Sequence, residues 1–273
     1  MKTDLLLNPM GADYAGMKAA ALAAEAAGFD GLWTWDHLRD TDGPGPTPEA
    51  WTVLSALAEA VPRLMLGPLV LNVISRHPAV LANMAATLQQ VSGGRLLLGI
   101  GAGGSHSTPY FREQEMIGNE VGSDRARGDR VVEAIAVMKH LWSGDRSDFA
   151  GRYYQLKGPS GFLRPNPPPP VIVGAFGPRM ARIAGQSGDG INTQAGHPEL
   201  ERLLTVARDA HSRSGRDPAG FLVTVFAGLS ERWLRPASRE RERLERASVD
   251  RLILLASPPF DVRAVSEAGA MLG

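Results

Sequence analysis

Short apolar runs rich in β-forming residues alternate along the chain with segments of helix length. The predicted strands are Asp4–Leu7, Gly31–Trp35, Leu64–Val70, Arg95–Ile100, Val171–Val173, Gly190–Thr193, Leu222–Ala227 and Arg251–Leu255. The predicted helices are Tyr14–Ala27, Pro48–Ala60, Ala79–Val91, Asp124–Trp142, Pro178–Gln186, Pro198–Ser214, Ala237–Ala247 and Asp261–Ala270. This strict alternation favours a parallel sheet with crossover helices, and eight units favour closure into a (β/α)8 barrel.

Two segments interrupt the alternation. Residues 104–122 follow the fourth predicted strand. Residues 144–170 precede the fifth, and contain a predicted hairpin around Phe149–Tyr154 and a stiff proline-rich run at Pro165–Pro170. Ligand sites of such barrels lie at the carboxyl ends of the strands, so an insertion there would help to wall the site. We predict one α/β domain over residues 1–273, a single TIM barrel carrying these two insertions.

The composition narrows the classes of protein that fit. Of the 273 residues, 44% are hydrophobic, which is enough for a large core. The formal net charge is zero, which disfavours a general binder of nucleic acid or membrane surfaces. The sequence has no cysteine, which excludes disulfides, a thiolate nucleophile, Cys-ligated zinc and iron–sulfur clusters. It shows neither an apolar run of membrane-spanning length nor a signal-peptide pattern, so we expect a cytoplasmic protein.

The first candidate for chemistry is a carboxylate beside an imidazole, in Trp35-Asp36-His37 at the end of the second predicted strand. At the mouth of a barrel, Asp36 could tune or orient His37 for proton transfer. A loop histidine beside a capping aspartate would give the same pattern, and position alone does not separate the two interpretations. The histidines show no metal-binding spacing, so no metal site is predicted.

Three further segments follow other predicted strands. Asn72, after the third, could hydrogen-bond a ligand, although a satisfied turn residue is the simpler interpretation. Gly99–Gly104, after the fourth, departs from the dinucleotide-binding glycine pattern; its backbone could lie close to a flat ring or form an ordinary tight turn. Gly174–Arg179, after the fifth, opens a predicted helix whose free N–H groups favour a phosphate, with an ordinary loop as the alternative.

Several motifs share their order and spacing with those of a known family. They are Ala26–Trp33, Trp35–His37, Gly67–Pro78, Ser92–Arg95, Leu98–Gly103, Gly177-Pro178 and Gly188–Gly190. Together they resemble the bacterial luciferase-like family, and within it the F420-dependent oxidoreductases. Gly67–Pro78, with the pattern G-P-x-V-x-N-x-x-x-R-H-P, is the most specific and is similar to the segment in methylenetetrahydromethanopterin reductase.

The resemblance implies a (β/α)8 barrel that binds a flat deazaflavin, coenzyme F420, at the carboxyl ends of the strands. It implies a non-prolyl cis peptide bond between Leu69 and Val70, in a bulge of the third strand, with Val70 against the ring and Asn72 at its polar edge. Two further segments would contact the cofactor. The backbone beside the ring would come from Gly101, Ala102 and Gly103. The groups that hold the phosphate would come from Gly174, Ala175, Phe176, Gly177 and Pro178.

The family's Asp-His pair maps onto Asp36 and His37. The resemblance implies that His37 gives, takes or orients a proton, and that Asp36 positions His37 or touches the cofactor. One position departs from the family, because Gly104 stands where some sugar-phosphate dehydrogenases carry a glutamate. A sugar phosphate is therefore a less expected substrate, and Glu113 and Glu115 of the insertion are only guesses for a second proton group.

The resemblance predicts an oxidoreductase that moves a hydride between F420 and a small organic molecule. Its substrate and the direction of transfer stay open. The alternatives are an FMN-dependent monooxygenase on the same barrel, a cofactor-binding protein without turnover and, less favoured, a metal-dependent hydrolase. Neither nucleic acid nor a membrane is an expected partner, and a homodimer stays open.

Overall fold

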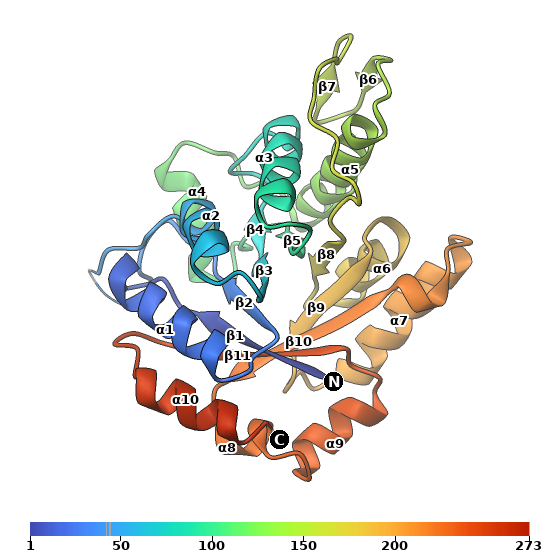
Figure 1. Ribbon diagram of the computed structural model, residues 1–273. Helices are drawn as coiled ribbons and strands as arrows, with labels where there is room; N and C mark the ends of the chain where they lie inside the picture. Colours follow the sequence, from blue (N-terminus) through green and yellow to red (C-terminus); the bar gives the residue numbers. More distant parts are fainter. Residues whose placement is uncertain (42, 44, 273) are drawn as a thin grey trace.

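The computed structural model describes residues 1–41, 43 and 45–272, and within them parallel strands form a closed sheet (Figure 1). The strands are β1 (Lys2–Leu7), β2 (Gly31–Thr34), β3 (Met65–Pro68), β4 (Leu71–Asn72), β5 (Leu98–Gly101), β8 (Val171–Gly174), β9 (Gly190–Gln194), β10 (Leu222–Gly228) and β11 (Arg251–Ala256). Their order is β3-β2-β1-β11-β10-β9-β8-β5-β4. A parallel bridge between Leu66 of β3 and Leu96, just before β5, joins the two edges. Because β3 and β4 are halves of one barrel strand, the predicted (β/α)8 barrel is confirmed.

Helices cover the outside of this barrel (Figure 1). The longer ones are α1 (Tyr14–Ala26), α2 (Ala50–Ala60), α3 (Pro78–Val91), α5 (Asp124–Ser143), α6 (Pro178–Ser187), α7 (Leu200–Arg213), α9 (Arg239–Arg246) and α10 (Val262–Ala270). Each predicted helix is found with its ends within two residues of the expected ones. The ends follow the side chains: the Asp13 carboxylate accepts a hydrogen bond from Gly16 N (2.7 Å) to cap α1, and Pro78 occupies the first turn of α3.

The structure differs from the predicted elements in two strands. The third is interrupted at Leu69-Val70, which separates β3 from β4. The fourth begins at Leu98 instead of Arg95, because the Arg95 guanidinium turns outward to donate hydrogen bonds to carbonyls at the end of α2 and in the loop after it. Four short elements were not predicted: η1 (Pro109–Phe111), α4 (Arg112–Met116), η2 (Pro218–Gly220) and α8 (Glu231–Leu234).

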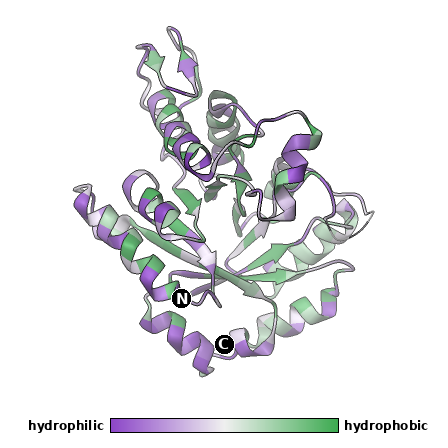
Figure 2. Ribbon diagram, turned by 180° about the vertical axis from the view of Figure 1, so that it is seen from behind, coloured by the Kyte–Doolittle hydropathy of each residue, from purple (hydrophilic) through white to green (hydrophobic). Residues whose placement is uncertain are grey.

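The barrel is filled by side chains, as the hydropathy of its strands indicates (Figure 2). An interior cluster holds Leu6, Trp33, Leu69, Leu97, Ile172 and Ile253. Near the amino ends of the strands, the buried Asp4 carboxylate accepts hydrogen bonds from Trp33 Nε1 (2.8 Å) and from Arg251 Nε and Nη2 (2.7 and 2.8 Å). This closed end supports the fold, while the opposite end carries the loops in which the sequence places its chemistry.

The second insertion contains the predicted hairpin, with β6 (Phe149–Ala150) antiparallel to β7 (Gln155–Leu156). Glu133 of α5 holds its turn, because the carboxylate accepts hydrogen bonds from the backbone N–H groups of Arg152, Tyr153 and Tyr154. The Tyr154 hydroxyl also donates a hydrogen bond to Val73 O (3.3 Å), so the hairpin contacts both α5 and the loop after β4. In the part of the chain that the structure describes, no helix is long and apolar enough to span a membrane.

Candidate active site

Asp36 and Arg76 form a buried ion pair just beyond the strand ends. Arg76 donates from Nη1 to Asp36 Oδ2 (2.7 Å) and from Nη2 to Oδ1 (2.8 Å), and the Asp36 side chain is only 3% exposed. The same Oδ2 accepts a hydrogen bond from Asn72 N (2.9 Å). Arg76 Nη2 also donates to Glu49, the residue that caps α2. Asp36 therefore ties the loop after β2 to the end of β4 and to α2.

The contacts of this site shift the pKa of Arg76 and of Glu49. Burial lowers the pKa of Arg76, but the hydrogen bonds and charges of Asp36 and Glu49 outweigh burial and raise it above its ordinary value. Burial raises the pKa of Glu49, but hydrogen bonds from Thr52, Trp51 and Arg76 outweigh it and lower the pKa below the ordinary value. Both shifts favour the charged forms of Arg76 and Glu49.

His37 contacts a residue of the first insertion instead of Asp36. Its Nδ1 lies 3.0 Å from Glu113 Oε1, and the two side chains are 19% and 5% exposed. The Tyr110 ring lies against the imidazole at 4.9 Å between centroids, and the Trp35 ring meets it edge-on at 5.9 Å. The imidazole is therefore held on three sides and partly open to the mouth.

Glu113 and Glu115 could not be told apart in the sequence, and the structure separates them. Both lie on α4, but Glu113 is buried against His37 and Glu115 is exposed. The neighbouring Gln114 fixes this orientation, since its Nε2 donates to Ser75 Oγ (2.9 Å) in the loop after β4. Insertion 104–122 thus walls the mouth and supplies a carboxylate to it.

The packing around position 104 explains why this chain has a glycine there. A Cβ built on Gly104 would lie 2.6 Å from Phe111 N and 2.7 Å from two atoms of Tyr110. The turn of η1 therefore occupies the space that a side chain at position 104 would need. The glutamate that the resemblance leads one to expect at this position would clash with η1, and the same insertion brings Glu113 to His37.

The bulge in the third strand lies against two glycines. The peptide bond between Leu69 and Val70 is cis, as the resemblance predicts. A Cβ on Gly101 would lie 2.6 Å from Val70 Cγ2, and a Cβ on Gly174 would lie 3.0 Å from it. Glycine at the ends of β5 and β8 therefore leaves the half-buried Val70 side chain room between two stretches of bare backbone. Leu69 is 6% exposed and belongs to the barrel interior.

The glycine-rich segment after β5 is held from both sides. Gly103 has φ of +70°, and a Cβ there would lie 2.5 Å from Asn72 Nδ2. Asn72 Oδ1 accepts a hydrogen bond from Ile74 N (3.0 Å), the local turn contact that the simpler interpretation expected. Arg127 of α5 donates from Nη1 to the carbonyls of Ala102 (3.2 Å) and Gly103 (2.5 Å). Arg127 was not foreseen, because nothing in sequence connects an arginine on the next helix to this loop.

The start of α6 presents backbone N–H groups at the end of β8. Gly177 caps the helix, and within the described chain no side chain bonds to its first-turn N–H groups. A Cβ on Gly177 would meet nothing within 4 Å. Ala175 is buried, with its N–H donating to Asn192 O (2.8 Å), so the available donors begin at Phe176. Arg179 turns away and pairs with Asp129 of α5 (2.5 Å).

The predicted site residues therefore gather at one end of the barrel, because the strands are parallel and their carboxyl ends meet there. Asp36 and His37 follow β2, Val70 precedes β4 and Asn72 ends it, and the glycine segments begin at the last residues of β5 and β8. Among residues 1–41, 43 and 45–272, no cluster of three or more His, Asp or Glu side chains is placed to hold a metal ion.

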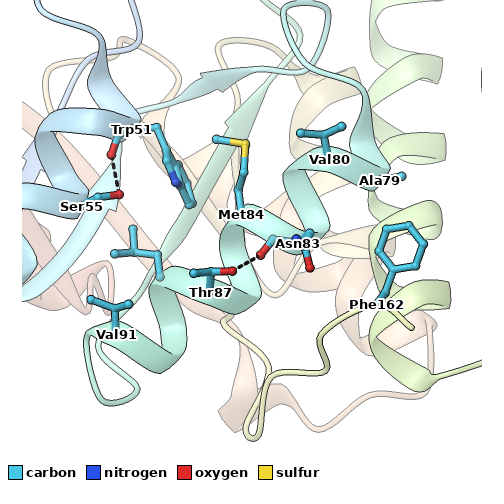
Figure 3. A pocket seen from close by; sticks show the side chains of 10 residues that line it. Trp51, Ser55, Ala79, Val80, Asn83, Met84, Thr87, Val91 and Phe162 are labelled. Atoms are coloured by element: carbon cyan, nitrogen blue, oxygen red, sulfur yellow. Dashed lines mark hydrogen bonds between the residues drawn. The ribbon is translucent and has the colours of Figure 1, made fainter. Parts of the chain in front are cut away.

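A separate hollow of about 480 Å³ lies on the outside, between α2 and α3 (Figure 3). Its walls are largely apolar, with Trp51, Met84 and Phe162 among them. The hydroxyls of Ser55 and Thr87 donate to carbonyls of their own helices (2.8 Å each). None of the residues at the strand ends lines this hollow, so it is not part of the candidate site.

The chain matches the family model described as luciferase-like monooxygenase over residues 3–251. It is 35% identical to an F420-dependent hydroxymycolic acid dehydrogenase of Mycobacterium tuberculosis, over 78% of this chain and 59% of that protein. It is 36% identical to an F420-dependent glucose-6-phosphate dehydrogenase of Microbacterium testaceum, over 71% of this chain and 57% of that protein. The chain thus spans about three fifths of the length of these curated relatives.

Solved structures share the fold along the whole chain. An F420-dependent secondary alcohol dehydrogenase, solved with an F420-acetone adduct, superposes with a TM-score of 0.83 at 22% identity, covering 100% of both chains. The F420-dependent tetrahydromethanopterin reductase of Methanopyrus kandleri superposes with a TM-score of 0.80 at 18% identity, covering 99% of this chain and 98% of that one. These likenesses confirm the barrel.

Proposed function

The chain belongs to the luciferase-like monooxygenase family, and we propose that it acts there as an F420-dependent oxidoreductase on a small alcohol or carbonyl compound. The observation that carries this proposal is the His37–Glu113 pair at the barrel mouth. The Val70 bulge lies at the same end of the barrel. The curated relatives named above support the choice of F420 over FMN, because both are described as F420-dependent dehydrogenases.

The residues at the mouth fit a flat ring that carries a phosphate. Gly101 and Gly174 leave bare backbone on either side of Val70, so a planar group can approach the bulge closely. The start of α6 offers N–H groups with open space around Gly177, which suits an anion. Val70, Asn72 and Gly101–Gly103 would border the ring, and Phe176–Pro178 would hold the phosphate. When bound, F420 supplies a carrier of one hydride, which is two electrons with one proton.

His37 is the proton-transfer group of this proposal. A carboxylate accepts hydrogen bonds only, so Nδ1 carries the proton in the pair with Glu113 and Nε2 is the ring atom left to take a proton from a substrate hydroxyl. In the opposite direction Nε2 returns the proton to a carbonyl oxygen. Glu113 holds the ring in this tautomer, and Asp36 acts one step further back by fixing the loop that carries His37.

Substitution of His37 by glutamine separates catalysis from binding. We expect F420 to bind the variant within about twofold of the wild type, and turnover of an alcohol or carbonyl compound identified by screening to fall by about 10²–10⁴-fold. Binding is followed by tryptophan fluorescence and turnover by the absorbance of oxidised F420. Unchanged turnover would remove His37 from the chemistry, and binding without turnover in the wild type would point to a carrier.

A further inference from the structure

Four loops around one half of the barrel mouth carry no arginine or lysine. They follow β1, β9, β10 and β11 and are residues 8–13, 195–199, 229–230 and 257–261. Three acids in these loops serve the helices behind them. Asp13 and Asp261 cap α1 and α10, and Glu199 pairs with Arg202 of α7.

The arginines that follow these loops are engaged elsewhere. In α8, the Arg232 guanidinium lies over the Trp233 ring at 5.5 Å, and Arg235 pairs with Glu231 (2.5 Å). Arg251 lies at the amino end of β11, in its pair with Asp4. A phosphate or carboxylate on a substrate in this half of the mouth would therefore meet no arginine or lysine from these four loops.

Three arginines of the other half are paired with acids. Arg76 is held by Asp36 and Glu49, Arg127 by Asp124 and two carbonyls, and Arg179 by Asp129. They follow β4, β5 and β8, on the side to which the proposed function assigns the cofactor. The arginines near the mouth thus lie on the side assigned to the cofactor, and the loops after β1, β9, β10 and β11 offer none to an anionic substrate.

Aromatic side chains come from both sides of the mouth. Phe226, near the end of β10, packs on the interior cluster of the barrel. The Phe176 ring, 57% exposed, meets it edge-on at 6.2 Å. Because β9 separates β8 from β10, these rings meet over the inner side of the barrel. Tyr110, 40% exposed, adds a third ring beside His37.

We infer that the substrate is a neutral alcohol or carbonyl compound with an apolar body, not a sugar phosphate or an organic acid. This inference rests on the proposed function and specifies its substrate class. The reaction remains the one described above: the hydroxyl proton goes to His37 Nε2, the hydride goes to F420, and the carbon–oxygen double bond forms. Apolar walls with a single polar pair are the arrangement typical of sites that select such molecules.

The test compares three hydroxyl compounds on the protein loaded with F420. They are 4-phenyl-2-butanol, 3-hydroxybutanoate and glucose 6-phosphate, which offer an apolar body, a carboxylate and a phosphate. We expect kcat/KM for 4-phenyl-2-butanol to exceed that of each anion by at least about 100-fold. We also expect 4-phenyl-2-butanone to quench Trp35 fluorescence in the cofactor-free protein, which reports binding without turnover.

Two variants test which side chains determine the preference for an apolar substrate. Phe226→Ala should raise KM for 4-phenyl-2-butanol about tenfold while leaving KM for 2-propanol within about twofold, since only the larger alcohol reaches the ring. Arg39→Ala, two residues beyond His37, should change neither value more than twofold.

The outcomes separate the two proposals. If F420 does not bind, the proposed function fails. If F420 binds and an anionic alcohol has the higher kcat/KM, or Arg39→Ala abolishes turnover, the substrate inference is overturned while the function stands. The substrate inference is also overturned if the protein binds F420 but neither binds the phenylbutyl compounds nor turns them over.

Discussion

Replacement of Arg76 by methionine tests whether the buried ion pair holds the site together. Among the described residues, the variant leaves the Asp36 carboxylate, 3% exposed, with only the hydrogen bond from Asn72 N. Removing one partner of a buried pair costs about 3–5 kcal/mol, because the remaining charge is uncompensated. The Arg76 side chain is 14% exposed and Glu49 is 41% exposed, so water can reach the pair from one side. We therefore expect the lower end, about 3 kcal/mol.

Thermal and urea unfolding measure this loss. For a chain of this size, about 3 kcal/mol corresponds to a fall of about 6 °C in Tm. Asp36→Asn combined with Arg76→Met removes both charges, so the double variant should recover about 2 kcal/mol relative to the sum of the single losses. Arg63→Met is the matched control: Arg63 is 71% exposed in its pair with Glu25 and should cost less than about 0.5 kcal/mol.

An Arg76→Met loss no larger than that of Arg63→Met would show that the buried pair does not stabilise the fold. If the two single losses simply add, the coupling between Asp36 and Arg76 is absent. Circular dichroism at the start of each melt shows whether the variant is folded before its stability is compared.

Three further predictions concern the insertion and the cap of α2. Glu113→Gln should lower kcat by about 10²-fold or more and alter its pH profile, whereas Glu115→Gln on the same short helix should leave kcat within about twofold. Gly104→Glu should lower Tm and turnover, because its Cβ meets Phe111 N at 2.6 Å; melting curves and F420 reduction check this, and a gain of glucose-6-phosphate turnover would contradict it. Glu49, whose pKa is lowered on folding, contributes stability above its ordinary pKa of 4.5 that is lost as pH falls through the folded value. The wild type should thus have a higher Tm than Glu49→Gln at pH 7, and this difference in Tm should shrink as the pH is lowered. A difference that grows in acid would contradict a lowered pKa of Glu49.

The barrel was predictable because each of its units repeats a local pattern. Buried strands and helices of ordinary length leave apolar runs, caps and glycines that can be seen in the sequence, as at Asp13 and Pro78. The short elements of the first insertion leave no such pattern. The five residues of α4 complete barely more than one turn, so no periodicity develops.

The candidate site was predictable in its parts and not in its contacts. The motif after β2 pointed to Asp36 and His37 as one pair, but their partners lie 40 and 76 residues further along the chain, at Arg76 and Glu113. Such contacts depend on where the insertion folds back onto the barrel. The residues next to Asp36 and His37 in sequence do not indicate that position. Glycine at position 104 could not be explained from the sequence either. It is required by the close packing of η1 and not by the geometry of its own turn.

Equilibrium titration of the purified protein with F420 and, separately, with FMN tests the central claim most directly. Trp35 lies at the mouth beside His37, so a bound chromophore should quench its fluorescence. Gly177→Asp places a carboxylate at the start of α6 and should weaken F420 binding about tenfold or more, while Gly177→Ala, whose Cβ meets nothing within 4 Å, should not. We predict micromolar binding of F420, much weaker binding of FMN and this difference between the variants. Preference for FMN would move the protein to the monooxygenases of its family, and binding of neither would contradict the account.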